Sequence, residues 1–334
     1  MQGIFQMHAL RRRLRLLGLL VLYASVATLA LSTVLAELGE RWWIADLFAH
    51  FRYHYALGAL LLAGAALALG RRVAGLAAAC LVAAQIWAIA APPRTPAIER
   101  AETGTPLRVM SANVLVVNAR HDDVAAAVER AAPDIVSLQE ISPAWHPVVE
   151  RLAKTLPYVA PADWRTRRSD TILLSRHPIR ASRTVIPPGP LDWFAHVEAT
   201  VEIGGRQVRV LAVHPPLPYG PLLTDIRQAH LNYYARTAAG ADLPLLIAGD
   251  FNITPYSPRF RALLRDGGLR YVHLGWAWPR SWPSGHYGPL TRHLRGFQID
   301  HVLTSRHFAV AGARAAEDVG SDHYPIIADL VLRR

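Results

Sequence analysis

The stretch LPLLIAGDFN, residues 243–252, decides how the fold and the chemistry of this chain are connected. An apolar run that ends in Asp250 and Asn252 is typical of a buried strand that stops at the edge of a sheet. Because side chains two positions apart on an extended strand point the same way, the carboxylate and the carboxamide should lie together. Such a pair suits phosphoester hydrolysis, since it could activate water and hold an oxyanion or a metal. Asp and Asn are equally common where a strand enters a turn, so this stretch alone leaves both interpretations open.

Polar side chains also end other predicted strands, which we expect at residues 107–115, 134–141, 171–175, 196–203, 207–214, 244–249, 298–304 and 324–332. The chemically capable ones are Asn113, Glu140, His214, Asp300 and the pair Asp322-His323. One alone means little, because an isolated histidine is more often a hydrogen-bonded surface or core residue than a catalyst. Together with Asp250 they predict one shared rim. Their carboxylate and carboxamide oxygens suit Mg²⁺, with Mn²⁺ as an alternative, and the chain has neither an HExxH nor a CxxC zinc motif.

Helical patterns are interspersed with these strands, at residues 122–132, 144–156, 222–239 and 258–266. The pair Gly204-Gly205 predicts a hairpin between two of the strands. Many strands with helices between them predict an α/β fold in which two packed sheets are covered by helices on their outer faces.

Composition separates the first ninety or so residues from the rest. The 334 residues are 52% hydrophobic and 18% charged, with a mean hydropathy of +0.17, and the apolar excess lies in that first part. The single cysteine, Cys80, excludes a disulfide framework and a cysteine zinc site. The formal charge of +11 fits a phosphate-bearing substrate or an anionic membrane surface. An arginine-rich composition would produce the same charge, so both explanations stay open.

Three apolar segments, residues 14–36, 55–70 and 73–91, predict three transmembrane helices. A cleaved signal peptide is the alternative for the first. Arginines cluster at residues 11–15 and at Arg71-Arg72, which places these parts in the cytoplasm and everything after residue 91 outside. We therefore expect a multi-pass cell-membrane protein. Its parts would be an anchor at 1–91, a polar Pro-rich linker at 92–106, and an extracytoplasmic catalytic domain at 107–334.

The motifs of the last part resemble, in order, those of the endonuclease/exonuclease/phosphatase superfamily. They are SANVL, SLQEI, TILLSR, VHPPLP, GDFN, IDHVLTS and SDHYPI, and they extend over nearly the whole of residues 107–332. GDFN and the terminal SDHYP are specific as a pair, whereas the shorter motifs are weak. The three apolar segments add a similarity to a membrane-attached bacterial branch. The resemblance implies a four-layer α/β sandwich of two packed mixed sheets flanked by helices.

The resemblance also implies roles for the residues that match its motifs. The metal would be held by Glu140, with help from Asn113 and Asp322. Asp250 would orient and deprotonate the attacking water, and Asn252 would hold a phosphate oxygen. Three residues complete the implied site: His323 on the phosphate, Asp300 bonded to His323, and His214 as a second phosphate-contacting or leaving-group-protonating imidazole.

Two positions depart from the family pattern. Asp170 begins a strand where many members have glycine, and we expect it to pair with Arg167 or Arg168 rather than to act in catalysis. The segment after His214 lacks the asparagine that abasic-site nucleases carry, which argues against DNA repair. His301 is expected to serve its strand rather than the phosphate.

The resemblance leaves the substrate open. The leading hypothesis is a membrane-anchored, Mg²⁺-dependent phosphoester hydrolase, most plausibly a nuclease-like phosphodiesterase. The alternatives are a phospholipid, sphingomyelin or phosphoinositide phosphohydrolase and a catalytically silent, membrane-bound binding module. Tryptophans at 276, 278 and 282 in the loop 271–290 could stack on bases, dip into a bilayer or form a small aromatic cluster. The expected partners are thus a nucleic acid or a lipid headgroup and the lipid bilayer, and no protein partner is identifiable.

Overall fold

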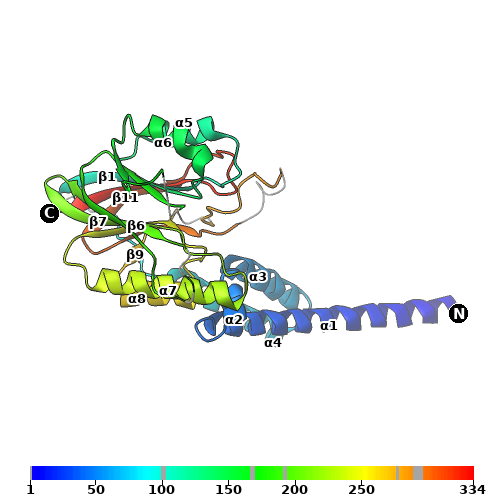
Figure 1. The fold of residues 1–334 in the computed structure, drawn as a ribbon. Coiled ribbons are helices and arrows are strands. Elements are labelled where there is room, and N and C mark those ends of the chain that lie inside the picture. The colour runs from blue at the N-terminus through cyan, green and yellow to red at the C-terminus, as the bar shows by residue number, and fades with distance from the viewer. Residues whose placement is uncertain are drawn as a thin grey trace. The chain divides into compact units, whose positions relative to one another are not determined.

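The computed structural model describes residues 2–98, 103–165, 170–189, 191, 194–275, 278–288 and 296–334. The chain divides into two compact units. Unit 1 comprises Met1–Ala91 with Tyr256–Pro258, and unit 2 comprises Pro92–Pro255 with Arg259–Arg334. Figure 1 shows unit 1 as helices and unit 2 as sheets with helices.

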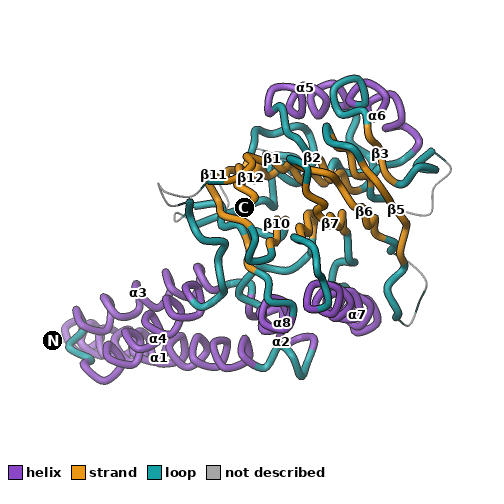
Figure 2. The backbone as a smooth tube through the Cα atoms, turned by 90° about the vertical axis from the view of Figure 1, so that its left-hand side faces the viewer, coloured by secondary structure: helices purple, strands orange, loops and turns teal. Residues whose placement is uncertain are grey.

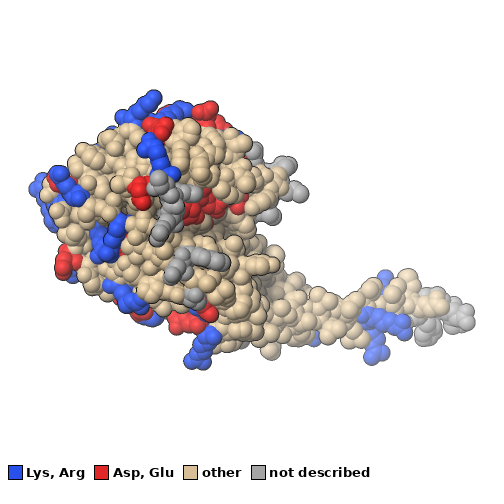
Figure 3. Space-filling model, in the orientation of Figure 1, with Lys and Arg blue, Asp and Glu red and all other residues tan. Residues whose placement is uncertain are grey.

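Unit 1 consists of four helices: α1 (Gln2–Glu37), α2 (Trp43–Ala49), α3 (Arg52–Ala68) and α4 (Arg72–Ala90). Two parts of them, Gln6–Glu37 and Arg72–Ala90, are long and apolar enough to cross a membrane. With 17 residues, α3 lies at the lower limit of a membrane-crossing helix. In Figure 3, the surface of α1 is almost free of charge except for basic groups towards its N-terminal end. The helices α1, α3 and α4 coincide with the three apolar segments of the sequence, and two of them, α1 and α4, are candidate membrane spans by length and composition.

A polar cluster lies inside unit 1. The side chain of Arg52 is buried and forms an ion pair with Glu37. Its guanidinium also donates to the carboxamide of Gln85 at 3.3 Å, and Gln85 donates to the hydroxyl of Thr33 at 2.8 Å. A buried charge is stable only when it is paired and hydrogen-bonded. The partners of Arg52 come from α1 and α4, so the cluster connects these two helices to α3.

Unit 2 is built on two six-stranded mixed sheets. The first has the order β11-β12-β1-β2-β4-β3, and the second has the order β5-β6-β7-β8-β10-β9. The strands of the first sheet are β1 (Gly104–Asn113), β2 (Ile135–Gln139), β3 (Tyr158–Ala160), β4 (Ile172–Ser175), β11 (Phe308–Ala315) and β12 (Ile326–Arg333). Those of the second are β5 (Ile179–Val185), β6 (His196–Ile203), β7 (Arg206–Val213), β8 (Leu245–Asp250), β9 (Arg270–Tyr271) and β10 (Asp300–Thr304).

Helices cover the outer face of each sheet, as Figure 2 shows. The first sheet is covered by α5 (His121–Ala131), a 3₁₀ turn at Pro143–Trp145 and α6 (His146–Leu152). The second is covered by α7 (Gly220–Ala239) and α8 (Pro258–Asp266). The four layers confirm the predicted α/β sandwich of two packed mixed sheets flanked by helices.

Alternation along β1 explains why the sheets pack face to face. Leu107 and Val109 lie in the core between the sheets, whereas Met110 and Ala112 pack under the helices α5 and α6. Because side chains alternate along a strand, Ser111 and Asn113 continue the inner face. The strand therefore begins with apolar side chains between the sheets and ends with polar ones, and this places a polar site at one end of the core.

The strands β3, β5, β9 and β11 were not expected from the sequence. They are the four outermost strands of the two sheets. Most of β5 is exposed, and its sequence IRASRTV has no apolar alternation. Such edge strands are held by backbone pairing to their neighbours rather than by burial of side chains, so they carry a weak sequence pattern. The predicted hairpin at Gly204-Gly205 is confirmed, and it joins β6 to β7.

The first residues after unit 1 run along unit 2. The backbone of Thr95 donates to the carbonyl of Tyr271 at 2.8 Å, and that of Ile98 donates to Val310 at 2.9 Å. Further on, β1 begins at Gly104. Within the stretch at 92–106, the residues up to 98 thus contact strands β9 and β11, and residues 104–106 are the start of β1, paired with β12.

Candidate active site

The predicted strand ends meet because of the sheet topology. β1 and β2 run parallel in one sheet, β7 and β8 run parallel in the other, and all four end on the same side. β10 and β12 are antiparallel to their neighbours β8 and β1, so the chain enters them on that side. A hydrogen bond of 3.1 Å from Asn113 Nδ2 to Asp250 Oδ2 connects the two inner faces there.

Asp250 is at the centre of the site, with only 1% of its surface exposed. Its Oδ2 lies 3.6 Å from Nε2 of His323 and 3.7 Å from Nε2 of His214. Burial raises the pKa of Asp250 to about 6, although the charge of His323 acts in the opposite direction. A buried carboxylate between two imidazoles is suited to accept a proton near neutral pH.

Gly249 is required for this position of Asp250. A Cβ at Gly249 would lie 1.9 Å from the carbonyl oxygen of Val213, its partner on β7. The close approach of the two parallel strands therefore explains the glycine of the GDFN motif.

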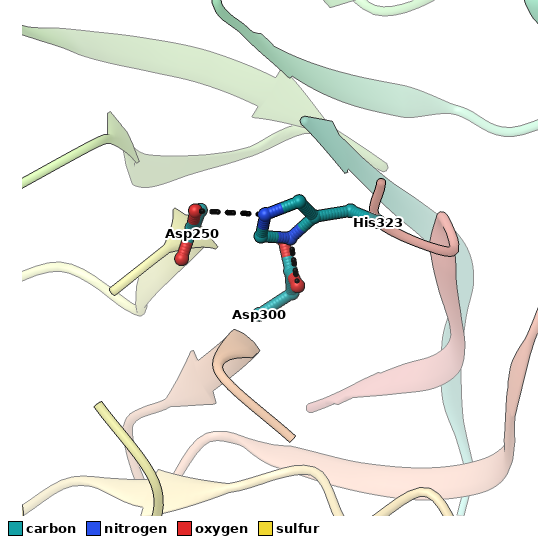
Figure 4. Close-up of side chains that lie close together, drawn as sticks. All are labelled: Asp250, Asp300 and His323. Carbon is teal, nitrogen blue, oxygen red and sulfur yellow. Dashed lines mark hydrogen bonds and ion pairs between the residues drawn. The ribbon is translucent and has the colours of Figure 1, made fainter. Parts of the chain in front are cut away.

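His323 is held by a buried carboxylate, as Figure 4 shows. Its Nδ1 lies 2.9 Å from Oδ2 of Asp300, and its Nε2 points to Asp250. Ser281 accepts a hydrogen bond of 3.0 Å from the backbone N–H of Asp300, which fixes the start of β10. Burial lowers the pKa of His323, but the negative charges of Asp300 and Asp250 outweigh it and raise the pKa to about 10. The imidazole is thus protonated at neutral pH.

His214 forms a similar pair with Asp170. Its Nδ1 lies 2.8 Å from Oδ2 of Asp170. Burial lowers the pKa of His214, but the charge and hydrogen bond of Asp170 raise it to about 9. Asp170, which was not expected to act in catalysis, therefore holds a site histidine. Its expected pairing with Arg167 or Arg168 stays a prediction. Arg167 and Arg168 lie outside the described residues.

Asn252 does not continue the strand, contrary to the expectation of an extended pair with Asp250. β8 ends at Asp250, and Asn252 has a φ of 52° in the left-handed region, which asparagine tolerates well. Its backbone N–H donates to Oδ1 of Asp250 at 2.8 Å, and its side-chain amide donates to the carbonyl of Pro215 at 3.1 Å. The turn therefore directs the carboxamide towards the segment after His214. Its role towards phosphate stays a prediction.

Glu140 and Asn113 form a second polar group. Glu140 directly follows β2 with a φ of 62°. Its Oε1 accepts a hydrogen bond of 2.9 Å from Asn113 Nδ2, and its Oε2 accepts one of 2.9 Å from the backbone of Val116. The left-handed backbone turns the carboxylate towards the end of β1 and so fixes it beside Asn113.

Asp322 receives two donors that the sequence did not indicate. Its Oδ2 accepts hydrogen bonds from Tyr287 Oη at 2.9 Å and from Trp282 Nε1 at 3.3 Å. Its Oδ1 is buried without a hydrogen-bond partner and lies 4.0 Å from Nε2 of His323. Partial desolvation and the carboxylate of Asp322 raise the pKa of Tyr287 to about 12, so its hydroxyl remains a donor. The abundance of aromatic residues in the loop was the available signal, but it did not name Asp322 as their partner.

A divalent cation fits the donors at this end of the core. The carboxylate oxygens of Glu140 and Asp322 are hard ligands, and Oδ1 of Asp322 is buried without a hydrogen-bond partner. Asn113 presents its Nδ2 to Glu140, whereas its Oδ1 accepts a hydrogen bond of 3.1 Å from the backbone N–H of Leu115. Among the described residues, Asp250, Asp300 and His323 also bring ligand atoms within 4.8 Å of one another. Around Asp250, the protonated imidazole of His323 already supplies a positive charge, so Glu140 and Asp322 are the better candidates for the metal ligands.

Two other expectations concern residues near the site. His301 lies on β10, where its Nε2 is 2.8 Å from the carbonyl of Ile253 and its ring packs on Phe260, so it serves the strand as expected. In the loop, Trp278 donates to the carbonyl of Gly296 at 3.2 Å, and Trp282 stacks on Phe297. These contacts favour the aromatic cluster among the three alternatives for the loop. Trp276 lies outside the described residues.

Known proteins share this architecture. An endonuclease/exonuclease/phosphatase from Beutenbergia cavernae is 22% identical, with a TM-score of 0.56 over 69% of this chain and 72% of that one. Sphingomyelinase C from Streptomyces griseocarneus is 21% identical, with a TM-score of 0.52 over 67% and 99% of the two chains. D. rerio TDP2, solved with a single-strand DNA product, is 18% identical, with a TM-score of 0.53 over 67% and 98%.

No curated protein matches the sequence significantly. The family model described as "Endonuclease/Exonuclease/phosphatase family" matches residues 110–323. This range begins in β1 and ends at His323, so it contains all the strand ends that form the site. The chain belongs to the endonuclease/exonuclease/phosphatase family.

Proposed function

We propose that this protein is a membrane-anchored, Mg²⁺-dependent phosphodiesterase that acts at the end of the sandwich where Asp250 lies. One observation carries the proposal: the carboxylate of Asp250 lies within 3.7 Å of two imidazoles, and each imidazole is bonded to a further carboxylate. A base next to two cationic acids suits the hydrolysis of a phosphodiester, which needs an activated water, neutralised phosphate oxygens and a protonated leaving group.

The proposed reaction is an in-line attack of water on phosphorus. Asp250 orients the water and takes its proton as the new P–O bond forms. The bond to the leaving oxygen breaks, and His214 supplies the proton that this oxygen needs. His323 stays protonated and neutralises the charge on the non-bridging oxygens, and Asn252 holds one of them. The products are an alcohol and a phosphomonoester, so atoms and charges balance.

The metal would be held by the carboxylates of Glu140 and Asp322, with Asn113 beside Glu140. When bound, Mg²⁺ would supply positive charge for the phosphate oxygens. The residues of this chain would prepare that place before binding. Asn113 orients the carboxylate of Glu140, and Tyr287 orients that of Asp322.

The membrane part of the proposal rests on the helices of unit 1. We propose that α1, α3 and α4 cross the membrane and that unit 2 lies outside the cytoplasm. This orientation agrees with the arginines in the N-terminal part of α1 and with Arg71-Arg72 at the junction of α3 and α4. A reporter enzyme fused after Arg334 tests the orientation. It should be active only outside the cytoplasm, and activity only inside would reverse the topology.

Two classes of substrate fit the chemistry. The sequence favours a nuclease-like activity, and TDP2 provides an example of this fold with single-stranded DNA. A lipid headgroup is the second candidate, favoured by exposed apolar side chains next to the active site. Both candidates require the same hydrolytic residues.

The test is hydrolysis by the purified full-length chain in detergent. Plasmid DNA, RNA, labelled phospholipids and bis(4-nitrophenyl) phosphate would be compared with Mg²⁺ and with excess EDTA. We expect Mg²⁺-dependent hydrolysis that is lost in Asp250→Asn and His323→Ala. His177→Ala is the matched control, because His177 follows β4 at the opposite end of the sheet. Hydrolysis that persists in both site variants contradicts the assignment, and a folded protein inactive on every substrate favours the silent binding module.

A further inference from the structure

Exposed apolar side chains of unit 2 are concentrated around the active site. Among its described residues, eight large hydrophobic side chains are exposed, and six of them lie on segments that follow or contact site residues. These six are Val116, Val117, Leu217, Tyr219, Leu222 and Tyr287. Scattered exposed hydrophobic residues need no explanation, but a group around a catalytic site indicates an interaction surface.

The first apolar tip is the turn at residues 115–118, directly after β1. The backbone N–H of Asn118 donates to the carbonyl of Leu115 at 2.9 Å, so Val116 and Val117 are the corner residues. The side chain of Asn118 closes the turn further, because it donates to the carbonyls of Val114 and Val319, each at 3.1 Å. Val117 is 75% exposed. Corners of turns favour glycine, proline, asparagine and aspartate, so the conformation of the turn does not explain why two valines stand here.

The second apolar tip is the segment at residues 215–220, directly after His214. It contains three prolines, and the N–H of Tyr219 donates to the carbonyl of Leu217 at 2.8 Å. Leu217 is 56% exposed and Tyr219 is 82% exposed. Prolines and the short hydrogen bond limit the conformations of the segment, so these side chains would lose little conformational entropy on binding.

Both tips are attached to the catalytic residues. In the first tip, the N–H of Val116 donates to Glu140. In the second, the carbonyl of Pro215 accepts the side-chain amide of Asn252. The tips therefore border the place where a phosphate would bind, so a surface that they contact lies next to the active site.

We propose that the two tips insert into the surface of a phospholipid bilayer and that the substrate is the phosphodiester of a lipid headgroup. This inference rests on the proposed phosphodiesterase function. Residues 114–118 and 215–223 contain no charged side chain, whereas single-stranded nucleic acid is held by basic groups and stacked aromatics. Valine and leucine favour the acyl region, and Tyr219 suits the interface between headgroups and water. Membrane spans in the same chain would keep a bilayer within reach.

The first experiment compares two substrates of the same full-length protein in lipid nanodiscs. The double variant Val117→Ser/Tyr219→Ser should hydrolyse phospholipid in the disc about tenfold more slowly, because both apolar contacts are lost. Its rate on soluble bis(4-nitrophenyl) phosphate should stay within about twofold of wild type, since neither side chain belongs to the hydrolytic residues. Tyr158→Ser is the matched control, because Tyr158 is an exposed tyrosine far from the active site. It lies opposite Ser175 of β4, which in turn lies opposite Ile135, and Ile135 begins β2 whereas Glu140 follows its end.

The results separate the two proposals. An unchanged rate on lipid, with activity on the soluble diester, overturns the tips as a membrane surface and leaves the phosphodiesterase intact. If the double variant loses as much activity on single-stranded DNA as on lipid, the tips are assigned to nucleic acid and the inference is overturned as well. If the wild type hydrolyses neither lipid nor diester, the proposed function fails, and membrane contact must be measured directly.

Direct contact is measured with a fluorescent label in a Cys80→Ser background, which removes the one native cysteine. An environment-sensitive dye attached to Val117→Cys should be quenched by a nitroxide on the lipid acyl chains, and the dye on Tyr158→Cys should not. Equal quenching at both positions, or none at position 117, overturns the inference whether or not the enzyme is active.

Discussion

The two aspartate–histidine pairs on either side of Asp250 have the same bond but different surroundings. In Asp300–His323, the side chain of the acid is 1% exposed, and its backbone is fixed by Ser281 at the start of β10. In Asp170–His214, the side chain of the acid is 38% exposed and lies at the start of the segment that leads into β4. Nε2 of both histidines is at nearly the same distance from Asp250.

The difference in the exposure of the two acids indicates different roles for the two pairs. A buried carboxylate cannot exchange its partner for water, so His323 remains a fixed cation beside the phosphate. A half-exposed carboxylate is screened by solvent, so His214 can release and regain a proton more easily. We therefore expect the pair with the buried acid, Asp300–His323, to contribute more to catalysis than the pair with the partly exposed acid, Asp170–His214.

The largest expected effect is the loss of an imidazole. His323→Ala should lower kcat on a soluble phosphodiester by about 10³- to 10⁴-fold, and His214→Ala by about 10²- to 10³-fold. Single-turnover rates at saturating Mg²⁺ would measure both. Equal losses would mean that burial does not distinguish the two pairs.

The acids that hold the imidazoles provide a finer comparison. Asp300→Asn should lower kcat about a hundredfold and Asp170→Asn about tenfold, because only the second acid has water available in its place. Asparagine keeps the shape of each side chain, so circular dichroism and the melting temperature should stay close to wild type. A larger loss in Asp170→Asn would reverse the assigned order.

Tyr287 tests whether the hydrogen bonds donated to Asp322 contribute to Mg²⁺ binding, an effect that we expect to be smaller than those of the aspartate–histidine pairs. Tyr287→Phe removes one hydrogen bond to a carboxylate, which corresponds to about a tenfold weaker affinity for Mg²⁺. The Mg²⁺ concentration at half-maximal activity would be measured beside Tyr158→Phe as control. If the two variants require the same Mg²⁺ concentration, Tyr287 does not position Asp322 for the metal.

His301 is a buried histidine whose Nε2 contacts a backbone carbonyl instead of a carboxylate. In contrast to the two site histidines, we expect it to affect stability rather than catalysis. Burial lowers the pKa of His301 from 6.5 to about 4. The unfolded chain therefore binds a proton more tightly than the folded one. The contribution of the neutral, buried His301 to the free energy of unfolding is complete above pH 6.5. It decreases as the pH falls from 6.5 to 4, by roughly 3 kcal/mol. His301→Gln should unfold with a smaller pH dependence in this range and keep its activity at pH 7.5 within about twofold, and an unchanged pH dependence would exclude His301 as its origin.

Much of the fold could be predicted from local pattern. The eight predicted strands and the helices of unit 2 follow apolar alternation and helical periodicity, and both report burial within one element. The edge strands could not be predicted, because their pairing depends on a neighbour far along the chain. β11, for example, pairs with β12 although its sequence FAVAGARA gives little alternation.

The candidate site was predicted in part for a similar reason. Strand ends such as Asp250 and His323 belong to ordered motifs, so the sequence alone named them. The contact of Asp170 with His214 was not predicted, because the two residues are 44 positions apart and only the packing of the two sheets brings them together. The turn at Asn252 likewise depends on a hydrogen bond to Pro215 across the site.

By itself, the sequence determined the family, the order of the elements, the apolar helices of the first part and the residue types of the site. These properties lie in local patterns and motifs, which do not need a partner. Only the tertiary structure decided which carboxylate holds which histidine, which loop donates to Asp322 and where exposed apolar side chains gather. Those relations depend on distances between residues far apart in the chain, and such distances arise only when the sheets pack.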